Sequence, residues 1–155
     1  MHYLPRNFAV KLKGELEVKD NLLLFGETFS YSKIMLGKIT AEQEYITVEE
    51  YLGGNFEKHI LNNNGDICGT NKCLREKAEC LAHFSFERSN KEIMVVDIQG
   101  VGNLLFDPEI ASREISANKE YLFCTRNLSN NAVTNFTEKH KGNFYCQLLD
   151  LPAIQ

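Results

Sequence analysis

One short apolar run in this sequence is followed at once by an acidic residue, an amide and a glycine. Residues Ile93–Val96 are all apolar and mostly β-branched. The run is typical of a buried strand and far shorter than the roughly 18 residues of a membrane-spanning helix. Asp97 follows directly, and alternation along a strand places Gln99 on the same side as Asp97. The sequence therefore predicts a buried strand over residues 93–98 that presents polar side chains at its end.

The glycines after this strand predict that the chain turns back. Gly100 and Gly102 permit a tight turn, so we expect Asp107, just before Pro108, to lie near Asp97. Two carboxylates brought together in this way can divide phosphoryl transfer between them. One holds the magnesium that bridges nucleotide phosphates, and the other orients or accepts the proton from a hydroxyl nucleophile. The alternative on spacing alone is structural, with both aspartates serving only to end a strand and cap a turn.

Length and composition indicate one α+β domain over residues 1–155. The chain is 43% hydrophobic and 25% charged, which is typical of a soluble globular protein. A net charge of −4 without a basic block argues against nucleic acid or a membrane as partner. The five cysteines are odd in number and irregular in spacing, which favours reduced thiols in the cytoplasm. No signal-peptide-like run occurs at the start, so we expect a cytoplasmic protein.

Apolar spacing and turn residues predict the remaining elements. Leu4, Phe8 and Leu12 recur every four residues and predict a first helix that ends by Gly14. Asparagines and a glycine at residues 62–65 predict a loop. The other expected elements are strands over residues 22–25, 29–39 and 45–52, a helix over residues 71–84, and a last helix over residues 131–149.

Three motifs follow one another in the second half of the chain, namely residues His83–Ser89, Val95–Gly102 and Phe106–Ile110. Together they resemble the alpha-type protein kinase family, an atypical family of serine/threonine kinases. The similarity runs in order over residues 27–152 and includes a hinge-like segment at residues 48–58. It implies a protein-kinase-like α+β fold with a nearly complete C-lobe and a truncated N-lobe sheet.

The resemblance implies a role for each residue that matches a family motif, with ATP and magnesium as cofactors. Asp97 would be the catalytic aspartate, Gln99 its neighbour at metal or phosphate, and Asp107 the second acid needed for metal binding and transfer. The nucleotide-binding positions would be Asn63 at the ribose or phosphates and the backbone groups of Glu49 and Leu52 at the adenine.

The same resemblance implies a structural zinc, but one ligand is absent. The family holds zinc with two histidines and two cysteines, and the matching positions here are His83, His140, Gly142 and Cys146. Three ligands and a water form a catalytic type of zinc site, whereas structural sites have four protein ligands. Another thiol, Cys80 or Cys124, is a possible substitute. The alternative is that the two histidines and Cys146 are ordinary packing residues.

Two further departures bear on activity. The family's glycine-rich substrate loop corresponds to residues 124–129, which retain Asn127 but contain no glycine. The strand that carries the family's phosphate-binding lysine would precede the first helix, and neither Lys11 nor Lys13 is placed to replace that lysine. A sheet without that strand is expected to leave an unpaired edge near residues 29–39.

These features leave two functional hypotheses, beside a plain α+β domain whose aspartates are only structural. The first is an ATP- and magnesium-dependent serine/threonine protein kinase whose substrate is a protein hydroxyl. The alternative is a pseudokinase that serves as a nucleotide- or protein-binding module. Since phosphoryl transfer depends on positioning and on cationic stabilisation, we predict weak or absent kinase activity for a chain that lacks the lysine strand.

Overall fold

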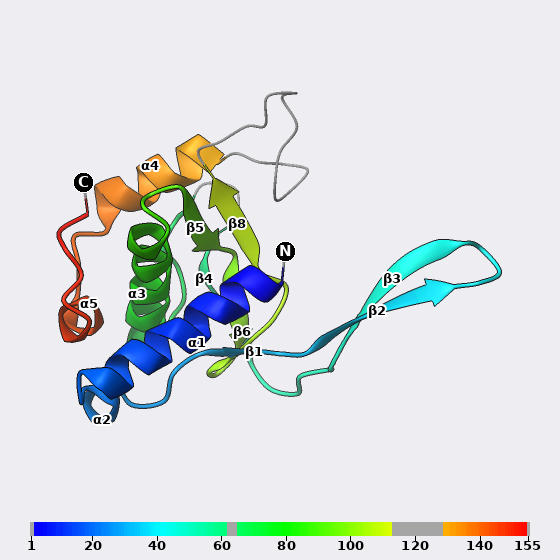
Figure 1. The fold of residues 1–155 in the computed structure, drawn as a ribbon, viewed down its shortest axis with the longest axis horizontal. Coiled ribbons are helices and arrows are strands. Elements are labelled where there is room, and N and C mark those ends of the chain that lie inside the picture. Colours follow the sequence, from blue (N-terminus) through cyan, green and yellow to red (C-terminus); the bar gives the residue numbers. More distant parts are fainter. Residues whose placement is uncertain (1, 62–64, 113–128, 155) are drawn as a thin grey trace.

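The computed structural model describes residues 2–61, 65–112 and 129–154. Helix α3 (Lys72–Arg88) lies at the centre, with α1 (Tyr3–Val18) crossing beside it and the strands lying behind (Figure 1). This mixture of helices and sheets confirms the α+β class. The other elements are α2 (Leu22–Phe25), β1 (Ser30–Tyr31), β2 (Ile34–Ile39), β3 (Glu44–Glu49), β4 (Phe56–Ile60), β5 (Ile93–Val96), β6 (Ile98–Val101), β7 (Leu104–Leu105), β8 (Glu109–Ser112), α4 (Ser129–Lys139) and α5 (Phe144–Leu148).

The apolar stripe of α1 continues past the glycine at which we expected the helix to end. Phe8, Leu12 and Leu16 are spaced four residues apart, and all three are buried. Gly14 lies inside the helix, where a glycine costs about 1 kcal/mol relative to alanine. Complete burial of Leu16 outweighs this cost. The predicted end at Gly14 is therefore wrong, and the helix runs to Val18.

Residues 22–25, which we expected to form a strand, form the single helical turn α2. The Phe25 N–H donates to the Asn21 carbonyl, and Gly26 ends the turn with a φ of 75°. Phe25 is buried against Tyr145, with ring centroids 4.9 Å apart. Four apolar residues are too few for periodicity to separate a strand from a helical turn, which explains the error.

The expected strand over residues 29–39 is divided between two sheets. β1 pairs in parallel with β7, whereas β2 pairs only with β3 within the described residues. The β2–β3 hairpin projects away from the rest of the chain (Figure 1). One of the two faces of this hairpin carries Met35, Ile46 and Val48, and all three side chains are substantially exposed. The expected unpaired edge is thus present, and β3 stops at Glu49 rather than reaching residue 52.

Helix α3 is the predicted helix, extended to Arg88. It begins at the predicted position because the Asn71 side chain caps it by accepting a hydrogen bond from the Leu74 N–H at 3.2 Å. Its C-terminal half is buried on almost every side. The Arg88 guanidinium donates two hydrogen bonds to Glu15, of 2.7 and 2.6 Å, which join α3 to α1.

The predicted strand over residues 93–98 is interrupted at Asp97. β5 pairs antiparallel with β8, whereas β6 joins a different sheet of order β1-β7-β6-β4. Gly100 lies where that sheet has no room for a side chain, because an added Cβ would approach the Leu104 carbonyl oxygen to 2.1 Å. The sequence therefore located the buried strand correctly but not the change of sheet at its end.

The predicted closing helix over residues 131–149 is in fact two helices, α4 and α5. Gly142 has a φ of 86° between them, a conformation that interrupts helical hydrogen bonding. Asn143 then caps α5 by accepting from the Cys146 N–H at 3.1 Å. No helix among the described residues is both long and apolar enough to cross a bilayer.

Candidate functional site

Asp97 lies at the point where the chain passes from one sheet to the other. It turns the backbone with a positive φ of 50°, a left-handed conformation that aspartate adopts more readily than most residues. Strained backbone of this kind is concentrated at functional sites. The side chain is buried, with 4% of its surface exposed. A buried carboxylate needs a partner, because leaving its charge without one is costly.

Lys58 on β4 supplies that partner. It lies opposite Gln99 across the β4–β6 pairing, and its Nζ is 2.5 Å from Asp97 Oδ1. The contact is an ion pair, since Oδ1 has no partner of hydrogen-bond geometry among the described residues. Sequence reasoning assigned no role to Lys58, although its place at the end of the hinge-like segment was a usable signal.

Gln99 connects the two aspartates. Its Nε2 donates to Asp97 Oδ2 at 3.3 Å and to the main-chain carbonyl of Asp107 at 3.2 Å. Asp107 also has a left-handed backbone, with a φ of 46°, and its side chain is exposed. The turn therefore brings Asp97, Gln99 and Asp107 together, as the glycines predicted. Their chemical roles remain predictions.

The two aspartates differ in electrostatic environment. Burial raises the pKa of the Asp97 carboxyl above its usual range, the Lys58 ammonium opposes this shift, and the Asp107 charge adds to it. Asp107 is exposed to solvent. Burial, together with the Asp97 charge, also raises the pKa of Tyr31. The site thus contains one shielded carboxylate beside a cation and one accessible carboxylate.

We expect Lys58→Met to raise the pKa of Asp97 further, because it removes the charge that stabilises the carboxylate. A carboxyl whose folded-state pKa lies above its unfolded value loses stability as pH rises through that range. The variant should therefore be destabilised more at neutral pH than at pH 4. NMR titration of the Asp97 carboxyl carbon and urea unfolding at both pH values measure the two effects. Lys72→Met, which removes an exposed lysine, is the control, and an unchanged Asp97 titration would contradict the assignment.

The predicted adenine-binding segment borders a hollow of about 410 Å³. Its lining is largely apolar, as a flat heterocycle requires. Phe56 and Phe106 lie on it with ring centroids 5.8 Å apart. The hollow is lined by Glu49, Glu50, Tyr51, Leu52, Phe56, Val101 and Phe106. Glu49 and Leu52 both line this hollow, and so does Phe106, which precedes Asp107 directly. Their role in adenine binding remains a prediction.

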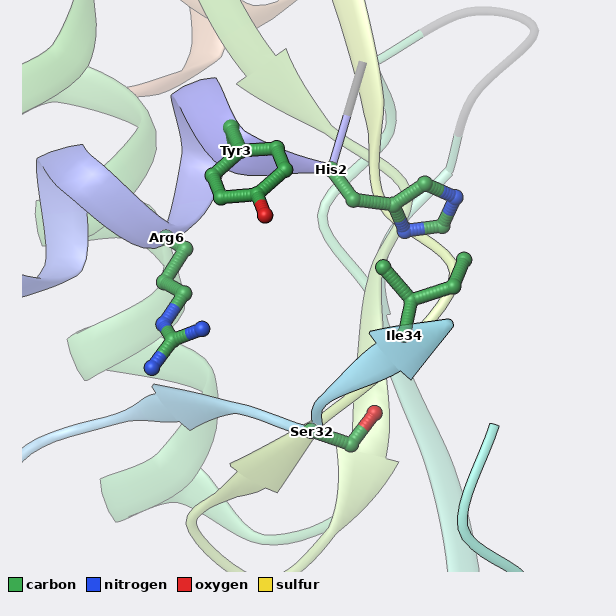
Figure 2. A pocket seen from close by; sticks show the side chains of 5 residues that line it. All are labelled: His2, Tyr3, Arg6, Ser32 and Ile34. Atoms are coloured by element: carbon green, nitrogen blue, oxygen red, sulfur yellow. The ribbon is translucent and has the colours of Figure 1, made fainter. Parts of the chain in front are cut away.

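The Glu49 side chain faces the accessible aspartate. Donor atoms of His2, Glu49 and Asp107 all lie within 4.8 Å of one another, and His2 Nδ1 is 3.7 Å from Glu49 Oε1. His2 precedes α1, so the start of this helix lies beside the site. Figure 2 shows a small pocket there, where His2, Tyr3 and Arg6 face Ser32, which lies between β1 and β2, and Ile34, the first residue of β2. Sequence reasoning did not find this approach of α1.

Two histidines and a cysteine form a second, fully buried cluster. His140 Nε2 lies 3.2 Å from His83 Nδ1 and 3.4 Å from the Cys146 sulfur. All three donor atoms lie within 4.8 Å of one another. Ligand atoms of a tetrahedral zinc site with usual bond lengths are about 3.3–3.6 Å apart. The three predicted ligands therefore converge with spacings that fit zinc.

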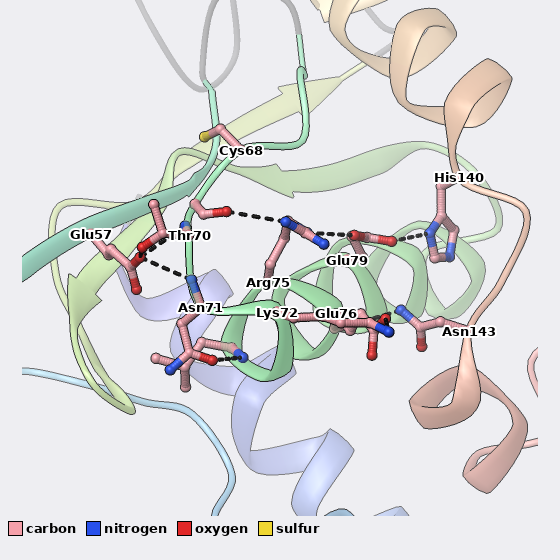
Figure 3. Close-up of polar contacts among 12 residues, drawn as sticks. Glu57, Cys68, Thr70, Asn71, Lys72, Arg75, Glu76, Glu79, His140 and Asn143 are labelled. Carbon is pink, nitrogen blue, oxygen red and sulfur yellow. Dashed lines mark hydrogen bonds and ion pairs between the residues drawn. The ribbon is translucent and has the colours of Figure 1, made fainter.

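The outer side of His140 is held by a chain of polar contacts (Figure 3). Its Nδ1 lies 3.0 Å from Glu79 Oε2, and Glu79 Oε1 is 3.9 Å from Arg75 Nε. Arg75 in turn donates to the Gly69 carbonyl at 3.2 Å. A carboxylate on the distal nitrogen is the usual way to orient a metal-binding histidine. Glu79, four residues before His83 on α3, was not found from the sequence.

The electrostatics of this cluster favour a charged pair. Burial alone would lower the pKa of His140, but hydrogen bonds with Cys146 and Glu79 raise it to about 9. The pKa of Cys146 is lowered to about 3, chiefly by a hydrogen bond from Cys80 and despite burial. The lowered pKa favours the thiolate form of Cys146, which is the form that binds metals.

The remaining predicted site residues have different outcomes. Gly142 lies in the turn between α4 and α5 and offers no ligand. Asn63, Cys124 and Asn127 lie outside the described residues, so their predicted roles remain untested.

Comparison with known proteins places this geometry among the alpha-kinases. The family model described as "Alpha-kinase family" matches residues 6–146. Transient receptor potential cation channel subfamily M member 6 of Homo sapiens is 35% identical over 112 residues. That alignment covers 72% of this chain and 6% of the channel protein.

Solved structures agree with the sequence match. The apoenzyme alpha-kinase domain of myosin-II heavy chain kinase A superposes with a TM-score of 0.77 at 25% identity, over 99% of this chain and 56% of that one. The ADP complex of the alpha-kinase domain of myosin heavy chain kinase A superposes with a TM-score of 0.75 at 27% identity. That match covers 96% of this chain and 55% of the solved chain. The chain thus spans little more than half of these solved domains.

Proposed function

The chain belongs to the alpha-kinase family, and from this premise we propose that it binds ATP with magnesium at the Asp97–Asp107 site. We further propose that this site is the phosphoryl-transfer centre of a serine/threonine protein kinase. One observation carries the proposal. Gln99 hydrogen-bonds both Asp97 and Asp107, whose backbones are left-handed, beside the hollow that borders Glu49–Leu52. The related alpha-kinase domain of myosin heavy chain kinase A has been solved in complex with ADP, which supports nucleotide binding by this chain.

The environments of the two aspartates suggest how they divide the work. The Asp107 side chain is exposed, and the side-chain nitrogen Nε2 of Gln99 is already hydrogen-bonded. The Asp107 carboxylate and the side-chain oxygen Oε1 of Gln99 are therefore available to hold magnesium. Bound magnesium would neutralise charge on the phosphates. Asp97 is buried and fixed by Lys58 and Gln99, which suits a group that orients the acceptor hydroxyl and takes its proton.

The second candidate function, a nucleotide- or protein-binding module, is favoured by the isolated β2–β3 hairpin. Within the described residues only two strands form this sheet, and a two-stranded hairpin is a weak platform for positioning phosphates. Lys58 is committed to Asp97 by an ion pair, so it is a poor candidate for a phosphate-binding lysine. We therefore expect nucleotide binding to be retained while transfer by this chain is weak or absent.

We also propose that His83, His140 and Cys146 hold a structural zinc. Two observations support this assignment: the spacing of the three donor atoms, and the contact of the Glu79 carboxylate with Nδ1 of His140. Zinc there would tie the segment after α4 to the central helix α3. In metal-free protein the same groups would retain the His140–Cys146 charge pair.

Titration of ATP with and without magnesium tests the proposed function. We expect binding that requires magnesium, measured by calorimetry, and little transfer of labelled phosphate to serine- or threonine-containing protein. Magnesium-dependent transfer that Asp97→Ala abolishes would establish an active kinase and overturn the expectation of weak activity. Absence of nucleotide binding under both conditions would overturn the nucleotide site itself.

A further inference from the structure

We propose that Arg75 is a positioning residue for Lys58, the lysine that pairs with Asp97. Arg75 acts from a distance, through the segment of residues 68–71 that lies directly before α3. The effect on Lys58 follows from contacts within the fold. Its consequence for phosphoryl transfer rests on the function proposed above.

The backbone of β4 at Lys58 is held by this segment as well as by the sheet. The pairing of β4 with β6 shifts register between Lys58 and Ile60, so the ladder is irregular there. Cys68 supplies two further contacts at this point. Its thiol donates to the Lys58 carbonyl at 3.1 Å, and its N–H donates to the His59 carbonyl at 2.8 Å. The segment thus helps to set the position of the backbone that carries Lys58.

Glu57, the residue before Lys58, fastens the same segment (Figure 3). One oxygen of its carboxylate accepts hydrogen bonds from the N–H groups of Thr70 and Asn71, at 2.9 and 3.1 Å, and from the Thr70 hydroxyl. Because side chains alternate along a strand, Glu57 faces the segment while Lys58 projects to the other side, toward Asp97. The strand is therefore anchored next to the residue that reaches the site.

Gly69 shows how closely the segment packs against β4. Its φ is 92°, a conformation that residues with a side chain rarely adopt. An added Cβ would lie 2.8 Å from Nδ1 of His59 and 3.2 Å from the Lys58 carbonyl oxygen. Because close-packed groups transmit strain, a displacement of Gly69 is expected to move the backbone of Lys58.

The Arg75 guanidinium fixes Gly69 relative to α3. Its Nη1 donates to the Gly69 carbonyl at 3.2 Å, and its Nε lies 3.9 Å from Oε1 of Glu79, about one turn further along the helix. The other Glu79 oxygen is 3.0 Å from Nδ1 of the buried His140. A forked guanidinium can hold two groups at once. Arg75 thus connects the buried histidine cluster with the segment that holds β4 (Figure 3).

A purely stabilising role for Arg75 predicts a different result from a positioning role. Arg75 and Glu79 form an ion pair four residues apart, and such pairs on helices add little to stability. Loss of Arg75 should therefore leave the urea unfolding curve nearly unchanged. The change is expected at Lys58 instead, because the segment holds the strand less firmly.

NMR of the Lys58 ammonium group in Arg75→Met tests the inference. Ion pairing with Asp97 protects the ammonium protons from exchange with water, and we expect their exchange to become about tenfold faster in the variant. Lys72→Met is the matched control, because it removes from the same helix a cation whose partner, Glu76, also lies four residues away. Unchanged exchange at Lys58 in Arg75→Met, or an equal change in Lys72→Met, would contradict the proposal.

A double-mutant cycle with Cys68→Ala tests the route of the effect. Cys68→Ala removes the thiol that bonds the Lys58 carbonyl, so it should also speed exchange at Lys58. If Arg75 acts through residues 68–71, the two changes should be less than additive, because both release the same segment. Additive effects would indicate separate routes and overturn the assignment.

The proposed function is tested separately in the same variant. Arg75→Met should bind ATP with magnesium as tightly as the unmodified chain, whereas kcat for any phosphoryl transfer should fall, because Lys58 acts on Asp97 and not on the nucleotide. Loss of ATP affinity in this variant would contradict that positioning role. A chain that binds no nucleotide at all would overturn the proposed function and leave the result at Lys58 in force.

Discussion

Replacing Asp107 with asparagine is expected to remove the magnesium-dependent gain in ATP affinity. The variant keeps the size of the side chain and tolerates the left-handed backbone, but it loses the exposed carboxylate that we assign to magnesium. A loss of about tenfold or more, equivalent to about 1.4 kcal/mol, is expected. Calorimetric titration of ATP at several magnesium concentrations measures it.

Asp97→Asn is the matched comparison, because it changes the other left-handed aspartate of the site. It should retain magnesium-dependent binding while abolishing any phosphoryl transfer, a decrease of about 10²–10⁴-fold. Loss of magnesium dependence in Asp97→Asn but not in Asp107→Asn would contradict the proposed division of roles. Asp20→Asn, another exposed left-handed aspartate, should affect neither measurement.

The largest loss of stability is expected from Phe136→Ala. Phe136 is completely buried on α4, and its ring stacks on His140 with centroids 5.0 Å apart. Truncation of a buried phenylalanine costs about 3–5 kcal/mol, because it loses apolar contacts and leaves a cavity. Urea unfolding of zinc-loaded protein measures the change in the free energy of unfolding. Metal affinity should fall as well, since the ring that holds His140 in place is removed.

Phe144→Ala is the control for this prediction. Phe144 begins α5 near the same cluster, but 51% of its surface is exposed. Its loss should change the free energy of unfolding by less than about 1 kcal/mol. Equal effects of the two variants would show that α4 does not pack on the core as described.

The site proposed to handle phosphate was largely predictable because its residues are close in sequence. Asp97 lies between β5 and β6, Gln99 on β6 and Asp107 soon after β7, so alternation and glycine placement were sufficient to predict that they lie together. The same local reasoning failed at residues 22–25, where a short apolar run fits either a strand or a helical turn. It also placed the first and last helix boundaries wrongly, because burial of Leu16 and the left-handed Gly142 outweighed local periodicity.

The sequence by itself thus determined the family motifs, the α+β class, the acidic turn and three candidate metal ligands. The tertiary structure alone decided which distant groups complete these sites. Lys58 reaches Asp97 from a neighbouring strand, and Glu79 contacts His140 from another helix. Periodicity describes which side of an element a residue occupies. It does not specify which other element packs against that side, because that choice depends on burial and charge summed over the whole chain.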